Sequence, residues 1–259
     1  MKKYSVFLCS LIAGVLIFSS TCLALNYGTN ITIWDGMGTN GEKEDGTTEP
    51  GCTWGQDWDL EGFFLDDWVL TMVGGYDFVA GNSNIYSGDL FIDINGDAKY
   101  GTGNVGGGSG NVTTAYNFGY DYVFDLDFTN LSYAVYKLSE SATVILNQNV
   151  YYSGNIGSNP WRYESGGTYV TGGTFGYLTG QADNADSNNI LAGGYHNVAT
   201  FDLSFLNPGT EFTTHFTMGC GNDNLMGAGQ TPVPEPSTMI LMGLGILGLA
   251  GLKKKRAVR

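Results

Sequence analysis

Apolar and polar residues alternate with a period of two along most of the chain, which is the period of β-strands. The clearest case is residues 120–128. There Tyr122, Phe124, Leu126 and Phe128 fall on one face, and Asp121, Val123, Asp125 and Asp127 fall on the other. We therefore predict a half-buried strand of an antiparallel sheet, apolar inward and acidic outward. Residues 131–138 are predicted to form its hairpin partner across Thr129 and Asn130.

Further segments with strand character follow along the chain, separated by turn clusters rich in Gly, Asn, Asp and Ser. They are residues 31–34, 68–74, 88–94, 142–150, 168–174, 198–203 and 211–218. No helical stripe of convincing length occurs between them. About ten short strands with this spacing predict one all-β domain at residues 25–231, an antiparallel β-sandwich or jelly roll.

The first 24 residues have the pattern of a secretory signal peptide. Its parts are the basic residues Lys2 and Lys3, the apolar residues 6–18 and the small-x-small site at residues 22–24. The apolar run is too short for a comfortable transmembrane helix. Cys22 leaves a lipoprotein as the alternative, although residues 19–21 match a lipobox poorly. We predict a signal-peptide helix, export by the Sec translocon, and cleavage by signal peptidase after Ala24.

Three consecutive segments form the C-terminal end, residues 232–259. They are a proline-rich segment with Val233, Pro234, Glu235, Pro236, Ser237 and Thr238, an uncharged apolar run at residues 239–252, and a basic tail of Lys253, Lys254, Lys255 and Arg256. Proline keeps the first segment extended, because its ring fixes φ. The apolar run is about 21 Å long as a helix, which is short against a core of ~30 Å, but flanking lysines can snorkel. By the positive-inside rule this predicts a transmembrane helix that holds the body outside the inner membrane.

This three-part tail resembles the PEP-CTERM sorting signal of bacteria that make exopolysaccharide. The resemblance covers about the last tenth of the chain, and the order, spacing and charge of the three segments agree. It implies recognition by exosortase, a multi-spanning membrane protein with its own catalytic cysteine, so that this chain is substrate rather than catalyst. It also implies that the tail is cut near the Pro-Glu-Pro segment and that the body is released or attached at the cell surface. An unprocessed tail anchor is the alternative.

Two internal segments carry a weaker resemblance to exosortase-dependent surface proteins. They are residues 88–97 and residues 220–225. This resemblance implies where the protein is placed and implies no reaction.

The charge of the chain is distributed unevenly. It has 11 basic and 25 acidic side chains, a net charge of −14. Residues 25–231 hold four of the basic and 24 of the acidic side chains, a net charge of −20. This excess of acid argues against nucleic-acid binding, which needs a basic patch. It leaves two interpretations: solubility through self-repulsion, and binding of divalent cations outside the cell.

The best ligand candidate is a short polar loop after a predicted strand. Asp93, Asn95 and Asp97 place oxygen-bearing side chains at alternate positions around Gly96. Calcium takes about six to eight oxygen ligands, and the EF-hand pattern would need a glycine after the third ligand and a later glutamate. A calcium site and an Asn-Gly hairpin turn therefore both stay open.

Cleavage of the signal peptide would leave two cysteines in the exported body, Cys52 and Cys220. An oxidising compartment favours a disulfide between them. Such a bridge would close a long loop and would contribute about 4–5 kcal/mol in the chain-entropy model. Two separate thiols are the alternative.

The body carries few residues that indicate catalysis. Its two histidines, His196 and His215, lie near no catalytic Ser or Cys motif, and no nucleophile elbow occurs. Trp54, Trp58 and Trp68 beside carboxylates suggest either core packing or sugar binding. The acid pairs Asp59/Glu61 and Asp66/Asp67 are expected by chance in so acidic a domain. We predict an exported, non-catalytic surface or matrix protein of a Gram-negative biofilm former, with a carbohydrate-binding module and a secreted glycan hydrolase as the alternatives.

Overall fold

The computed structural model describes most of the body of the chain. It covers residues 27–33, 55–99, 110–148, 158–182, 191, 194–221 and 223–233. The predicted signal peptide at residues 1–24 and the predicted membrane helix at residues 239–252 lie outside these residues. Within the described part, no helix is both long and apolar enough to cross a bilayer.

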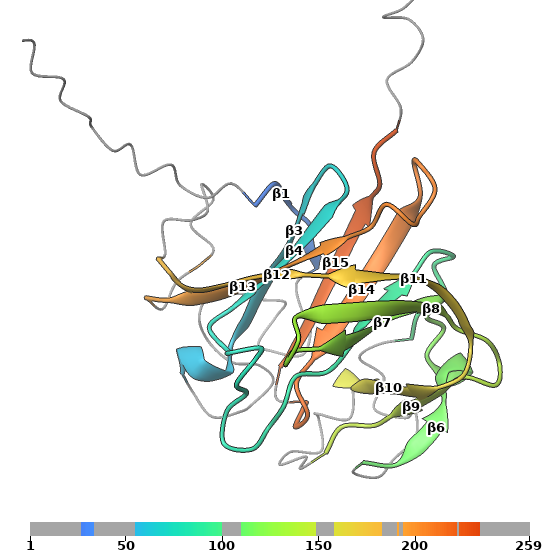
Figure 1. The fold of residues 1–259 in the computed structure, drawn as a ribbon, viewed down its shortest axis with the longest axis horizontal. Helices are drawn as coiled ribbons and strands as arrows, with labels where there is room; N and C mark the ends of the chain where they lie inside the picture. The colour runs from blue at the N-terminus through green and yellow to red at the C-terminus, as the bar shows by residue number, and fades with distance from the viewer. Residues whose placement is uncertain are drawn as a thin grey trace, which may run out of the picture.

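The described part is all-β and every strand pairing in it is antiparallel, as predicted. One sheet has five strands in the order β1 (Thr29–Asn30), β3 (Leu60–Asp66), β4 (Val69–Gly74), β13 (His196–Asp202) and β12 (Gly176–Gln181). Figure 1 shows β1, β3 and β4 from the N-terminal half of the chain beside β13 and β12 from its C-terminal half.

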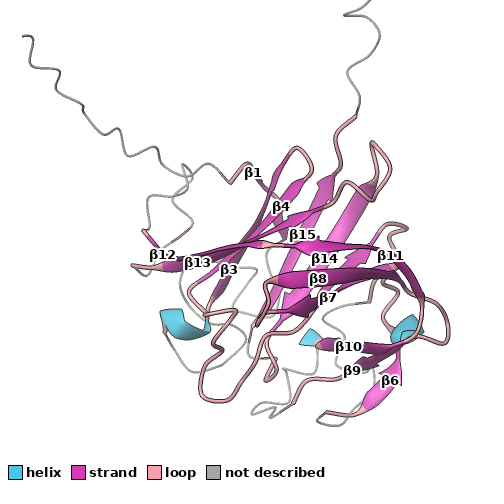
Figure 2. Cartoon of the chain, viewed as in Figure 1, coloured by secondary structure: helices cyan, strands magenta, loops and turns pink. Residues whose placement is uncertain are grey.

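A second sheet has seven strands. Their order is β11 (Thr168–Thr174), β8 (Ser132–Lys137), β7 (Tyr122–Asp127), β5 (Leu90–Asp93), β14 (Glu211–Thr217), β15 (Asn224–Gln230) and β2 (Thr32–Ile33). A third sheet is small, with the order β10 (Arg162–Ser165), β9 (Thr143–Ile145) and β6 (Val112–Thr114). The two helical turns described are 3-10 helices, η1 (Gln56–Trp58) and η2 (Ala115–Asn117), and Figure 2 shows that strands dominate the body.

The core lies in layers between these sheets. The main cluster joins inward side chains of the five-stranded sheet, such as Phe63 and Phe201, to those of the seven-stranded sheet, such as Phe124 and Phe216. Each of these aromatic side chains is almost fully buried, and such burial contributes roughly 1.5–3 kcal/mol per side chain. Two sheets packed face to face around a common core make the fold sandwich-like.

The small sheet covers the opposite face of the seven-stranded sheet. Phe91 and Val123 point away from the main core and pack with Val144 of β9 in a second cluster. This corrects the predicted strand at residues 120–128. Its second face is not an exposed acidic surface, because Val123 is buried and Asp125 is half-buried.

Most strongly alternating segments form the predicted strands. β7 and β8 pair as a hairpin, with Phe124 opposite Val135. β11 has the predicted bounds, and β4 and β14 differ from theirs by one residue. The prediction missed six of the described strands: β1, β3, β6, β10, β12 and β15.

Candidate functional site

The last strand of the body ends in a hydrogen-bonded junction with the C-terminal tail. Thr231 follows β15 and is only 1 % exposed. Its amide donates to the Thr210 carbonyl oxygen at 2.9 Å, and the Thr210 amide donates to Thr231 Oγ1 at 2.8 Å. Thr231 Oγ1 in turn donates to the Asn207 carbonyl oxygen at 2.7 Å. These bonds fasten the end of β15 to the turn that precedes β14.

The next two residues mark where the chain leaves the folded body. The Gly209 amide donates to the Pro232 carbonyl oxygen at 3.1 Å, so Pro232 is still attached. Val233 is 64 % exposed. The body therefore holds the chain through Pro232 and presents it to solvent at Val233.

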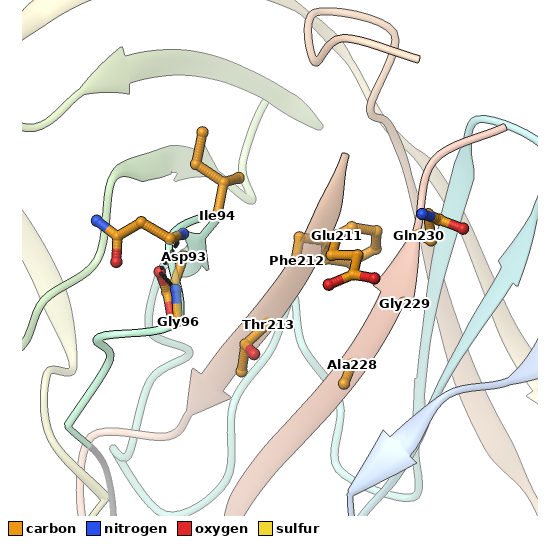
Figure 3. A pocket seen from close by; sticks show the side chains of 10 residues that line it. Asp93, Ile94, Gly96, Glu211, Phe212, Thr213, Ala228, Gly229 and Gln230 are labelled. Atoms are coloured by element: carbon orange, nitrogen blue, oxygen red, sulfur yellow. Dashed lines mark hydrogen bonds between the residues drawn. The ribbon is translucent and has the colours of Figure 1, made fainter. Parts of the chain in front are cut away.

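A surface pocket of about 480 Å³ lies at the same end of the sheet (Figure 3). Its walls come from the start of β14, the end of β15 and the loop after β5; they are residues 93–96, 211–213 and 228–230. The register explains this arrangement, because Glu211 pairs with Gln230 and Thr213 pairs with Asp93. Four of the lining residues carry amide or carboxylate groups, namely Asp93, Asn95, Glu211 and Gln230, and Phe212 forms part of the wall. The polar pocket thus adjoins the junction with the tail.

The predicted calcium loop forms one wall of this pocket and is a closed turn. Asp93 is 2 % exposed. Its Oδ1 accepts from the amides of Asn95 at 2.9 Å and Gly96 at 3.0 Å, and its Oδ2 accepts from Ala98 at 3.1 Å. Gly96 has a φ of +80°, which favours glycine at this position. Backbone amides therefore engage both Asp93 oxygens, as in an Asx turn.

Asp121 adds a further carboxylate to this loop. Its Oδ2 accepts from the Ile94 amide at 2.8 Å, and its Oδ1 accepts from Asn95 Nδ2 at 3.4 Å. Burial raises the pKa of Asp121, and repulsion from Asp93 and Asp97 adds to this effect. Among the described residues, no group of three or more His, Cys, Asp or Glu is arranged to hold a metal ion. Calcium binding by Asp93, Asn95 and Asp97 stays a prediction.

A buried pair of ionisable groups joins β3 and β13, the two strands on either side of β4, to η1. His196 Nδ1 lies 2.6 Å from Glu61 Oε2, and neither side chain is exposed. Gln56 Nε2 donates to Glu61 Oε1 at 2.7 Å and to the Tyr195 carbonyl oxygen at 2.9 Å. Asp59 is also fully buried. The pair Asp59/Glu61 therefore lies in the interior, with Glu61 bonded to other buried groups.

A second buried carboxylate connects the seven-stranded sheet to the small sheet. Asp89 Oδ1 accepts from the Leu126 amide at 2.9 Å, and its Oδ2 accepts from the Tyr163 amide at 2.8 Å. Arg162 Nε lies 3.9 Å from the same Oδ2. Burial raises the pKa of Asp89 to about 7, although Arg162 acts in the opposite direction. The contacts explain a structural role for Asp89 within residues 88–97.

The structure places the other predicted candidates apart from one another. Trp58 is partly buried and packs against the main core. Asp66 and Asp67 are exposed at the turn between β3 and β4. Cys220 is fully buried in the main core, whereas Cys52 and Trp54 lie outside the described residues. The disulfide between Cys52 and Cys220 stays a prediction.

Sequence reasoning missed the residues that hold the junction. The sequence does indicate a turn at residues 207–209, because Asn, Pro and Gly are typical turn residues. The sequence did not indicate that Thr231 contacts this turn, because β15 was not predicted and Thr231 lies 24 residues away from Asn207 in the chain.

Comparison with protein families decides the nature of the tail. The chain carries a PEP-CTERM protein-sorting motif at residues 232–256. This confirms the predicted tail from its first proline through its basic residues. The PEP-CTERM motif begins at Pro232, the last residue that the body holds by a hydrogen bond described above. No curated protein and no solved structure matches the chain.

The PEP-CTERM motif indicates an exosortase-sorted surface protein with an exported, membrane-anchored precursor. The motif covers only the tail, so it gives no information about what the sandwich-like body binds. The junction at Thr231 and Pro232 joins these two parts without an intervening linker.

Proposed function

We propose that this protein is an exported, non-catalytic component of the cell surface or extracellular matrix, which exosortase processes at its C-terminal tail. The observation that carries the proposal is the PEP-CTERM motif directly after a folded body. The last strand of the body, β15, ends at Gln230, before the motif starts at Pro232, and Val233 is exposed. Proline favours an extended backbone, and an extended peptide is what a processing enzyme needs to engage.

The distribution of charge supports the same orientation. Residues 25–231 carry a net charge of −20, and basic residues lie at both ends of the chain. Basic residues next to apolar segments stay on the cytoplasmic side of a membrane. In our proposal the Sec translocon exports the body and signal peptidase removes the signal peptide. The tail then spans the inner membrane until processing. The body finally reaches the surface together with exopolysaccharide.

The proposal is tested by replacing Pro234, Glu235 and Pro236 with alanine and fractionating the producing cells. We expect the variant to accumulate in the inner membrane, whereas the natural protein leaves it. In cells without exosortase the two proteins should behave alike, which is the control for an effect on folding. Equal release of both proteins from cells that contain exosortase would contradict the proposal.

Carbohydrate binding is a second candidate function, and one pocket favours it. A pocket of about 400 Å³ is lined by Asp57, Gly75, Asp77, Gly81, Asn82, Thr179, Gly180, Tyr195 and Asn197. Planar carboxylate and amide groups are suited to sugar hydroxyls, and Tyr195 adds an aromatic ring that is 41 % exposed. Its hydroxyl donates to Asp57, and this bond raises the pKa of Tyr195 to about 12. The lining holds no Lys or Arg, so it suits neutral or amino sugars rather than acidic ones.

A glycan array tests this second candidate with a matched pair of tyrosine variants. Tyr195→Ala should lose binding to neutral or amino sugars. Tyr116→Ala removes a tyrosine that is 67 % exposed in η2 and should bind as the natural protein does. Absence of glycan binding by the natural protein would remove the candidate.

A further inference from the structure

Among the strands that the structure describes, the two large sheets share one edge that continues from one sheet into the other. β11 is the terminal strand of the seven-stranded sheet, and β12 is the terminal strand of the five-stranded sheet. Only Phe175 separates them in the chain, and its side chain is buried in the main core. Figure 1 shows the two strands following one another across the molecule. We call residues 168–181 the shared edge.

The composition of the shared edge differs from that of the rest of the body. Residues 165–182 contain no charged residue and no proline, and the flanking residues are Glu164 and Asp183. Soluble proteins usually protect edge strands with lysine, proline or bulges. Here the register shifts between Tyr169 and Thr171 and again between Leu178 and Gln181. Between these shifts, residues 171–178 are uncharged and leave the strand conformation only at Phe175, where the chain passes from one sheet to the other.

The side chains of the shared edge are exposed and partly apolar. Tyr169 is 61 % exposed, Leu178 is 46 % exposed and Val170 is 39 % exposed. Within the described ranges, each edge strand has a hydrogen-bonded neighbour strand on one side only, β8 for β11 and β13 for β12. Its other side can therefore accept an additional strand, and main-chain hydrogen bonds would supply the affinity.

We propose that the shared edge binds a second copy of this chain by antiparallel strand pairing. Two copies with a net charge of −20 each repel one another over most surfaces, so the charge of the body limits where two copies can meet. The uncharged edge is where that repulsion is weakest. A strand that pairs antiparallel with itself is also self-complementary under a two-fold axis. This pairing is a property of the body and does not depend on processing by exosortase.

Sedimentation of the full-length protein in a density-matched detergent tests the proposal. The natural protein should form dimers as its concentration rises. Val170→Lys and Leu178→Lys each put two like charges into the paired edge and should weaken association by about tenfold or more. Val69→Lys is the matched control, because Val69 is 43 % exposed but lies in β4, which has neighbours on both sides.

The outcomes separate cleanly. Association of the natural protein and of Val69→Lys, with a loss in both edge variants that keep their thermal unfolding transition, supports pairing at the edge. A natural protein that stays monomeric at all concentrations overturns the proposal. Equal association of all four proteins also overturns it, because association would then use another surface.

Discussion

Single buried residues couple the stability of the body to pH in opposite directions. Asp89 is a buried carboxyl, and burial favours its neutral form. His215 is a buried imidazole whose Nε2 lies 2.9 Å from the Pro160 carbonyl oxygen. Burial lowers the pKa of His215 to about 4. Both residues thus favour the neutral state, but the carboxyl gains a proton to reach it and the imidazole loses one.

The first prediction concerns Asp89→Asn. The pKa of Asp89 is about 7 in the folded protein against 3.8 for an ordinary Asp, so the folded state holds an extra proton between these values. Its contribution to stability is therefore present below about pH 4 and is lost as the pH rises to about 7. Urea unfolding should show a smaller decrease across this window for Asp89→Asn than for the natural protein. An identical pH slope in both proteins would rule out this role.

The second prediction concerns His215→Gln. The pKa of His215 falls from 6.5 to about 4 on folding, so the unfolded chain binds the extra proton between these values. The natural protein should lose this contribution as the pH falls from about 6.5 to about 4. The glutamine variant cannot titrate and should lose less stability over that window in the same urea experiment. A variant that loses as much as the natural protein would contradict the assignment.

At the scale of elements, the alternation of apolar and polar residues predicted the strands that have one apolar face and one more polar face. β7, β8 and β14 alternate clearly and were predicted, whereas β3 reads Leu-Glu-Gly-Phe-Phe-Leu-Asp and was missed. In β3, Phe63 faces the main core and Phe64 faces a smaller cluster with Tyr27, so apolar side chains occupy both faces and the period of two disappears. β15 was missed because two glycines and an alanine give it little β-propensity.

Close packing of the two sheets explains the glycine in β15. A Cβ at Gly227 would lie 3.0 Å from Phe63 Cβ and 3.1 Å from Thr214 Cγ2. Gly227→Val should therefore destabilise the body by about 1–3 kcal/mol through overpacking, despite the higher β-propensity of valine. Ala228→Val, at the exposed neighbouring position, should change stability by less than about 0.5 kcal/mol. Urea unfolding of both variants measures the difference, and an equal effect would contradict the packing argument.

At the scale of the whole molecule, the sequence predicted the tail better than any site in the body. The PEP-CTERM motif is contiguous, so its order and charge are visible along the chain. The contacts around the junction and the pair Glu61–His196 join residues far apart in sequence. Such contacts depend on the order of strands in the sheets, and local periodicity does not reveal that order. The Asp93 loop is an intermediate case, since the sequence indicated its turn, whereas calcium binding there stays a prediction.

The hydrogen bonds at the end of β15 also bear on where the tail can be cut without disturbing the body. Hydrogen bonds hold Thr231 and Pro232 against residues 207–210, and Val233 is exposed. Cleavage between Val233 and Thr238 would leave these contacts and the body intact. We therefore predict that exosortase processing removes the apolar run and the basic tail without unfolding β15.

The mass of the C-terminal peptide of the mature protein tests the central claim most directly. In cells that contain exosortase, the protein recovered outside the inner membrane should end within residues 233–238. In cells that lack exosortase, the chain should retain Lys253, Lys254, Lys255 and Arg256 and should stay with the membrane. Recovery of the chain with its basic tail intact outside the membrane of cells that contain exosortase would contradict the account.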